Sequence, residues 1–245
     1  MRRSRGVVTA GLCLALVAGV ASLAMAMGDG GRHADRPAEQ PGQRFGDPFA
    51  GVPLSFEPNV GQVDDAVRFL SRGPDFDLFL TPSEAVVRLA GSAGDPASVL
   101  RMRPVGAGAN PAATMTPGRS LPGTSHYMRA GTLEASSTAV PTFADVRYAD
   151  VYPGIDLVFH GNGRRLEHDF VVAPGVDPSQ ILVELDGHRS MGVSPEGELV
   201  LDTAGGAVRM AKPVIYQEAG GRRSLVAGRF QVRGDREVGF EVGPY

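Results

Sequence analysis

Three carboxylates near the middle of the sequence are the residues best placed to do chemistry. Asp156 precedes the Gly-Asn-Gly-Arg segment at residues 161–164, and Glu167 and Asp169 follow it. Asn-Gly is a strong hairpin signal, because a primed two-residue turn needs positive φ at its central positions. A turn there places Asp156 opposite Asp169, with Cβ atoms about 5 Å apart. Carboxylates at this spacing suit Ca²⁺, and about 5 Å also separates the two acids of a retaining glycosidase.

The same acids also fit a purely structural interpretation. Two carboxylates that face each other destabilise a β ladder unless a positive charge or a proton relieves the repulsion. Arg147, Arg164 and Arg165 are close enough in sequence to supply that charge on the outer face of the hairpin. The sequence leaves both interpretations open, with Asp156, Glu167 and Asp169 as the candidate metal ligands.

The hairpin that positions these acids spans residues 155–172. Its two arms alternate apolar and polar residues, so one face is apolar and the other charged. His168 falls on the apolar face, where a packed and satisfied ring is expected rather than a ligand. The residues predicted to share that face are Ile155, Leu157, Phe159, Leu166, His168, Phe170 and Val172.

The remaining motif search gives no catalytic residue and no cofactor site. The segment around Ser190 lacks the first glycine of a nucleophile elbow, because His188 stands in its place. No P-loop and no His-x-x-x-His pair occurs in the sequence. Arg233-Gly234-Asp235 is a tripeptide that adhesion receptors read, but Gly and Asp are also ordinary turn residues.

Residues 1–26 have the composition of a signal peptide. Arg2, Arg3 and Arg5 precede an apolar run at 7–23, and Ala24-Met25-Ala26 forms a small-residue cleavage site. The mature chain is expected to begin at Met27 and to be secreted or held in the cell envelope. The alternative is an uncleaved membrane anchor; after cleavage no segment is apolar enough to span a bilayer.

Composition excludes several classes of protein. Cys13 is the single cysteine and lies inside the leader, so the mature chain has no disulfide and no thiolate ligand. A formal net charge of −3 gives no reason to expect a nucleic-acid partner. With 42% hydrophobic residues the chain can bury one good core or two small ones.

The rest of the chain predicts an all-β, antiparallel, sandwich-like fold built from hairpins and meanders. Turn signals recur every eight to twelve residues or so, and helical periodicity is almost absent. The 33 glycines and 19 prolines favour the same class. We expect a disordered linker at 27–53, an N-terminal β unit at 54–178 with the hairpin at its centre, and a packed C-terminal unit of hairpins at 179–245.

Several blocks of the sequence carry a resemblance to a known bacterial family. The blocks are FEPNVGQ (56–62), VRFLSRGPDFDLFLTPSEAV (67–86), VPTFADVRYADVYPGIDLVFHG (140–161) and LEHDFVVAPGVDPSQI (166–181). With them the chain resembles the N-terminal β domain of exported SBBP-repeat proteins, a domain that precedes β-propeller repeats. The resemblance implies an exported, non-catalytic domain and brings no catalytic residues. It also implies that a surface facing a downstream propeller is exposed near the C-terminus, as a strand edge or an apolar patch.

Two functions therefore stand as hypotheses from the sequence. The first is an exported structural, adhesion or interaction module whose partner is a downstream propeller, a surface protein or a glycan. The second is a carbohydrate-active or Ca²⁺-dependent protein that uses the acidic face of the hairpin. An open cleft lined by the three acids would favour the second, and a flat outer face the first.

Overall fold

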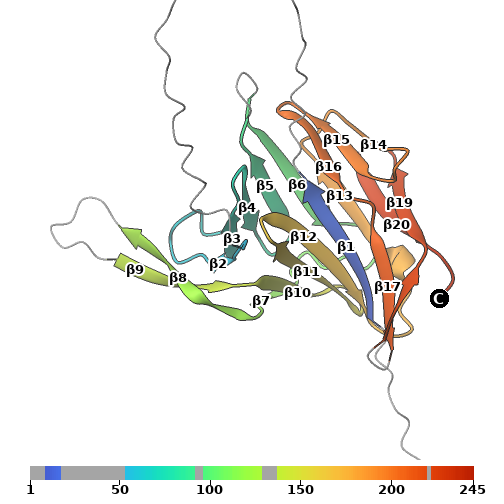
Figure 1. Cartoon of the computed structure of the whole chain (residues 1–245), viewed down its shortest axis with the longest axis horizontal. Helices are drawn as coiled ribbons and strands as arrows, with labels where there is room; N and C mark the ends of the chain where they lie inside the picture. The colour runs from blue at the N-terminus through green and yellow to red at the C-terminus, as the bar shows by residue number, and fades with distance from the viewer. Residues whose placement is uncertain (1–8, 18–52, 92–95, 129–136, 220–221) are drawn as a thin grey trace, which may run out of the picture.

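Two antiparallel β-sheets pack against each other around one hydrophobic core (Figure 1). The computed structural model describes residues 9–17, 53–91, 96–128, 137–219 and 222–245. Within these ranges the helical structure is limited to one 3-10 turn, η1 (Pro178–Gln180). No helix in the described part of the chain is long and apolar enough to cross a membrane. The prediction of an antiparallel all-β fold made of hairpins is confirmed.

The first sheet has ten strands and contains the predicted hairpin. Its order is β14-β15-β16-β1-β12-β11-β10-β7, and β17 also pairs with β1 and carries β18 on its other side. The strands are β1 (Thr9–Val17), β7 (Thr114–Pro117), β10 (Asp145–Tyr152), β11 (Ile155–Asn162), β12 (Arg165–Val172), β14 (Ser190–Val193), β15 (Leu199–Thr203), β16 (Gly206–Met210), β17 (Val214–Ala219) and β18 (Arg222–Val226).

The second sheet has eight strands in the order β19-β20-β13-β6-β5-β4-β3-β2. Its β2 to β6 part is a meander in which each strand pairs with the next. The strands are β2 (Glu57–Pro58), β3 (Phe69–Arg72), β4 (Phe76–Leu80), β5 (Ala85–Leu89), β6 (Ser98–Pro104), β13 (Leu182–Asp186), β19 (Gly228–Arg233) and β20 (Glu237–Val242).

A separate hairpin, β8 (Ser120–Met128) with β9 (Ser137–Phe143), projects from one end of the molecule (Figure 1). Polar side chains attach it to the second sheet. The Ser125 hydroxyl and the Tyr127 hydroxyl donate to the two carboxylate oxygens of Glu57, and the Arg72 guanidinium donates to the Tyr127 hydroxyl. Burial and this carboxylate together raise the pKa of Tyr127.

Aromatic residues join the two sheets. Phe170 of β12 meets Phe240 of β20 with ring centroids 5.9 Å apart in an edge-on arrangement. The Tyr148 hydroxyl donates to the carbonyl of Thr81 at 2.9 Å, and the Tyr152 hydroxyl donates to the carbonyls of Val105 and Leu182. Each buried hydroxyl thus has a partner on the opposite sheet, which satisfies it and fixes how the sheets align.

The two packed layers do not correspond to the sequence segments 54–178 and 179–245. In the second sheet β13 pairs with β6 on one side and with β20 on the other. In the first sheet the strands from 190 onward reach the hairpin through β1. Each layer therefore combines strands from both segments, and residue 178 is no boundary between sheets.

The predicted leader and linker are described only in part. Residues 9–17, inside the predicted leader, form the strand β1, which lies between β12 on one side and β16 and β17 on the other. Residues 1–8 and 18–52 lie outside the described residues, so the predicted cleavage site and most of the linker do too.

Candidate functional site

The central hairpin forms where the sequence predicts it, but with a different register. His160 faces Glu167, Val158 faces Asp169 and Asp156 faces Val171. The two-residue loop is Gly163-Arg164, with φ of 60° at Gly163 and no positive φ at Arg164, as in a type II′ turn. The predicted pairing of Asp156 with Asp169 is therefore wrong by two residues. An offset of two keeps every side chain on its predicted face.

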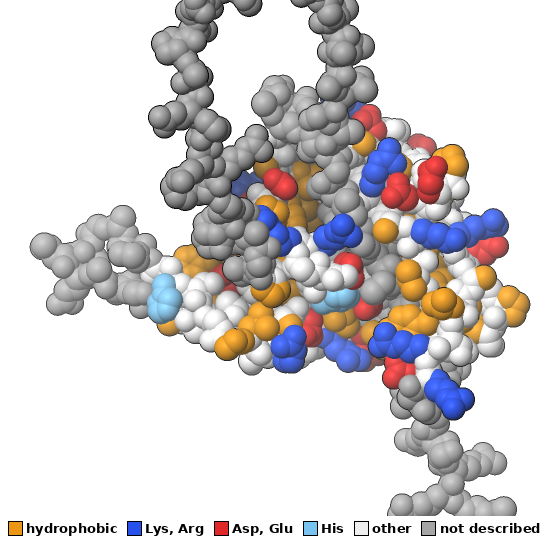
Figure 2. All heavy atoms as spheres, in the orientation of Figure 1, with side chains coloured by type: hydrophobic (Ala, Val, Ile, Leu, Met, Phe, Trp, Pro, Cys, Tyr) orange, Lys and Arg blue, Asp and Glu red, His pale blue; other side chains and the backbone are white. Residues whose placement is uncertain are grey.

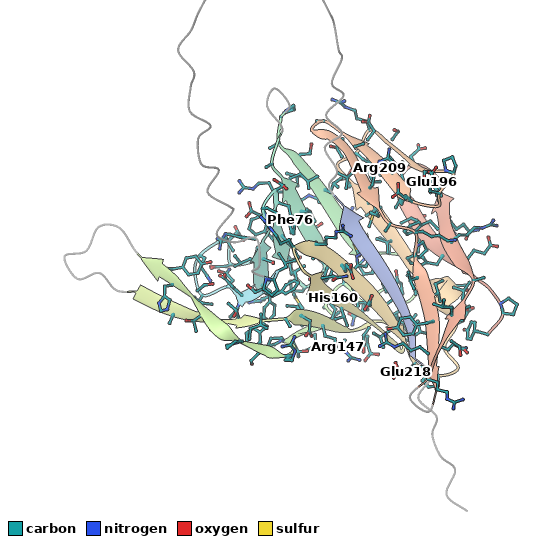
Figure 3. The ribbon with its side chains drawn as sticks, in the orientation of Figure 1. Phe76, Arg147, His160, Glu196, Arg209 and Glu218 are labelled. Atoms are coloured by element: carbon teal, nitrogen blue, oxygen red, sulfur yellow. The ribbon has the colours of Figure 1, made fainter. Side chains whose placement is uncertain are left out.

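Asp156 is held by its own neighbours. One carboxylate oxygen accepts hydrogen bonds from the Arg147 guanidinium, with Nε at 2.8 Å. The other accepts the backbone N–H of Asp150 at 2.7 Å. Asp150 has φ of 51° and sits where the β10–β11 pairing shifts register, so Asp156 secures a β-bulge. Arg147 is paired with Val158, two residues before His160 on β11, so Arg147 and His160, both labelled in Figure 3, lie on the same face of the sheet.

Asp169 is paired with a histidine. The His160 Nε2 lies 3.2 Å from one oxygen of Asp169, and this hydrogen bond raises the pKa of His160. The second oxygen of Asp169 is buried and has no hydrogen-bond partner among the described residues. Glu167, two residues earlier on β12, accepts a hydrogen bond from the Asn162 side chain at 2.9 Å.

The three predicted metal ligands thus have three different local partners. The register moves Asp156 and Asp169 from directly opposite positions to diagonal ones, where Cβ atoms are about 7 Å apart in a regular ladder. In the described part of the chain, no group of three or more His, Cys, Asp and Glu side chains is placed to hold a metal ion. The Arg-paired interpretation of Asp156, with Arg147 as its partner, is confirmed.

His168 lies in the core, as the alternation predicts. Its ring packs between Phe159, at 5.6 Å, and Phe170, at 5.9 Å between centroids. Burial lowers the pKa of His168 to about 4, because the charged imidazolium cannot be solvated there. The ring is therefore neutral near pH 7 and acts as an aromatic core residue.

This buried ring predicts a loss of stability in acid. In the unfolded chain His168 binds a proton near pH 6.5, whereas in the folded chain it does so only near pH 4. The stability that depends on a neutral His168 ring is therefore fully present above pH 6.5 and is lost as the pH falls toward 4. The difference between these two pKa values corresponds to about 3 kcal/mol of unfolding free energy. Urea denaturation of the wild type and of His168→Leu between pH 7 and 4 measures it, and the variant should show the flatter profile.

His160 provides the matched control, because its linkage has the opposite sign. The hydrogen bond to Asp169 raises the pKa of His160 in the folded chain above its value in the unfolded chain. The protonated pair therefore stabilises the fold at pH values below the unfolded-state pKa, and this stabilisation is lost as the pH rises through the folded-state pKa. His160→Gln should therefore steepen the loss in acid. Parallel pH profiles for the wild type and His168→Leu would contradict the assignment of the acid sensitivity to His168.

An open depression lies elsewhere, between the β17–β18 hairpin and the β19–β20 hairpin. It has a volume of about 590 Å³, and we call it the C-terminal groove. Leu225 is 81% exposed and Val214 48%, and both line this groove. Exposed apolar side chains that share one surface often mark an interaction site. Figure 2 shows hydrophobic side chains exposed on the face near β17. The groove is lined by Lys212, Pro213, Val214, Ile215, Leu225, Val226, Ala227, Gly228, Arg229, Glu241 and Gly243.

Charged residues border the apolar part of this groove. The Arg229 guanidinium donates to the Glu241 carboxylate at 2.6 Å across the β19–β20 pair. Sequence reasoning did not single out Leu225 or Val214, because isolated surface hydrophobic residues are common. The related signal in the sequence is the expectation, implied by the family resemblance, of an apolar surface near the C-terminus that faces a propeller, and it stays a prediction.

The Arg233-Gly234-Asp235 tripeptide begins at the end of β19 and forms the turn into β20. Gly234 has φ of 66°, and the Asp235 carbonyl accepts a hydrogen bond from the His188 ring at 2.9 Å. These contacts account for the tripeptide as a hairpin turn.

Comparison with protein families gives a match over most of the chain. The family model described as Domain of unknown function (DUF7948) matches residues 56–245, from the residue before β2 to residue 245. No curated protein and no solved structure matches the chain. The matched region contains both sheets apart from β1, together with the C-terminal groove. The chain therefore belongs to the family of the domain of unknown function DUF7948.

Proposed function

We propose that this protein is an exported, non-catalytic β domain that binds another protein module in the cell envelope or outside the cell. The observation that carries the proposal is the C-terminal groove, where Leu225 and Val214 expose apolar surface inside a rim that includes Lys212, Arg229 and Glu241. An apolar centre with a polar rim is the usual anatomy of a protein interface.

The occupant that we propose is a β-propeller module of the SBBP-repeat type. The groove is bordered by Glu241 and Gly243, at the end of the last strand and just after it. A module joined after residue 245, or docked there from another chain, would meet the groove directly. The blocks that resemble the N-terminal domain of SBBP-repeat proteins support the same partner.

A titration with a separately prepared SBBP-repeat propeller tests the docking. We expect the full chain to bind it, and Leu225→Asp to bind at least tenfold more weakly, because a carboxylate would replace a central apolar contact. Val193→Asp is the matched control: Val193 is 44% exposed, lies on β14 outside the groove and should leave binding unchanged. No binding by the wild type, or equal losses in the two variants, would contradict the proposal.

Export is tested by the N-terminus of the protein made in a bacterial host. We expect the extracytoplasmic fraction to contain a chain that begins at Met27, identified by mass spectrometry of its terminal peptide. A chain that keeps Met1 and stays in the cytoplasm would contradict the export half of the proposal.

A further inference from the structure

The strand β1 occupies a central place in the first sheet. It pairs antiparallel with β12, from Ala10 opposite Val172 to Leu16 opposite Leu166. On its other side it pairs antiparallel with β17 and then with β16, with Cys13 opposite Val214. Figure 1 shows β1 between β12 and β17. Among the described strands, β12 is connected to β16 and β17 only through β1.

Removal of such a strand would open a slot in the sheet. Neighbouring strands lie about 4.8 Å apart, so the backbones of β12 and β17 would face each other across about 10 Å. Backbone N–H and C=O groups on both edges would lose their partners. Unpaired edges of this kind are templates for another strand.

The same residues, 9–17, lie within the apolar core of the predicted signal peptide. A segment cannot be cut off during export and also remain the central strand of the exported protein. The inference below rests on the export half of the proposed function, and it concerns what replaces the leader.

The linker that follows is a poor substitute for β1. A central strand uses its N–H groups on both sides, which proline cannot supply. Residues 27–53 contain Pro37, Pro41, Pro48 and Pro53, and the longest proline-free run, 27–36, is rich in Gly and charged residues. This composition does not match a nine-residue position inside an apolar sheet.

The slot selects for an apolar strand. Phe170 and Val172 of β12 and Ile215 of β17 are buried beside it. An apolar cavity lies among these side chains, lined also by Val226 of β18 and Phe240 of β20. A strand entering from outside would place alternate side chains over this layer.

We propose that the gap between β12 and β17 is a strand-acceptor site, held by the leader segment Thr9–Val17 before export and filled afterwards by an apolar strand of a partner protein. The incoming segment has about nine residues without proline, and it runs antiparallel to both β12 and β17, as β1 does.

The first test uses the single cysteine of the chain. Directly opposite residues in an antiparallel pair have Cα atoms about 4.5 to 5.5 Å apart, within the range that a disulfide spans. In the full chain, made by cell-free synthesis without membranes, Val214→Cys should therefore cross-link to Cys13 on mild oxidation. Ser224→Cys, on β18 and away from β1, is the control and should not. Mass spectrometry of unreduced peptides reads the result.

The second test asks whether the site accepts a strand in trans. A full chain with a protease site placed within residues 27–53 is cut and mixed with a fluorescent peptide of residues 9–17. We expect exchange to raise the anisotropy of the peptide. The same peptide with Leu14→Pro should bind at least tenfold more weakly, because the ladder loses a central hydrogen bond.

The outcomes separate the two proposals. Absence of the Cys13 cross-link, or equal binding of the two peptides, overturns the acceptor site. Dimerisation of the cut chain after its leader is removed would place a second copy in the slot and overturn the partner strand. A leader that stays attached in cells, with both tests positive, contradicts both export and the partner strand, because β1 then keeps its place; the tests would still demonstrate that the slot accepts a strand.

Discussion

Replacing Gly187 by Ala is expected to destabilise the protein by about 4 kcal/mol or more. Gly187 has a φ of 96°, a backbone conformation that residues other than glycine rarely adopt. A Cβ there would also overlap the backbone carbonyl oxygen of Val99, which cannot move without disturbing β6. Because β6 and β13 join the N-terminal meander to the C-terminal strands, the variant should lose the connection between the two halves of the second sheet.

Gly234→Ala is the control that separates backbone conformation from the steric clash. Gly234 also has positive φ, 66°, but no atom lies within 4 Å of an added Cβ. It should cost only about 1 kcal/mol, the strain of a left-handed residue. Unfolding free energies from urea titrations compare the two variants. Similar values would show that φ alone, and not the Val99 carbonyl, makes Gly187 necessary.

Local pattern predicts the hairpin well but does not fix its register. The alternation around residues 155–172 gives the correct strands and the correct apolar face. The turn nevertheless forms at Gly163-Arg164, because Gly161 is needed within the strand: a Cβ there would lie 2.7 Å from the Cβ of Leu54. The Leu54 N–H donates to the Gly163 carbonyl at 2.8 Å and holds this crossing segment in place. Leu54 lies more than 100 residues before this turn in the sequence, so the turn residues alone could not predict that it contacts them and sets the register.

The acidic site was mispredicted for the same reason. Placing Asp156 opposite Asp169 requires a turn centred on Asn162-Gly163, with or without its two neighbours, and a shift of two residues removes the pair while every side chain keeps its face. The Arg147 partner of Asp156 was predictable, because β10 and β11 are adjacent strands joined by a short connection. The bulge at Asp150, which adds a backbone donor to Asp156, carries no recognisable turn motif.

Pairings between strands that are distant in the sequence are the least predictable part of the fold. Hairpins between neighbouring strands follow from turn signals, as at Ser194–Gly197, where the Gly197 N–H donates to the Ser194 carbonyl at 2.9 Å. The pairing of β13 with β6, or of β7 with β10, depends on which apolar faces meet across the core. The short strand β7 is an edge strand of the first sheet, a position that tolerates its proline at 117.

Phe170→Ala is expected to cost about 3 to 5 kcal/mol, the range for truncating a buried phenylalanine. Phe170 has no exposed surface, and its ring contacts His168 on its own strand and Phe240 on the opposite sheet. Truncation leaves a cavity between the layers, beside the place where β1 passes β12. Urea denaturation measures the free energy, and the loss of the aromatic contact should also alter near-UV circular dichroism.

Leu225→Ala is the counterpart of Phe170→Ala, because it also removes a large apolar side chain, but from the exposed C-terminal groove and not from the core. At 81% exposure it should change the unfolding free energy by less than about 0.5 kcal/mol. A large effect would mean that Leu225 stabilises the isolated fold, so that its exposure could not be attributed to a partner. A small effect on stability, together with weaker propeller binding by Leu225→Asp, would show that Leu225 serves the partner, whereas Phe170 holds the two sheets together.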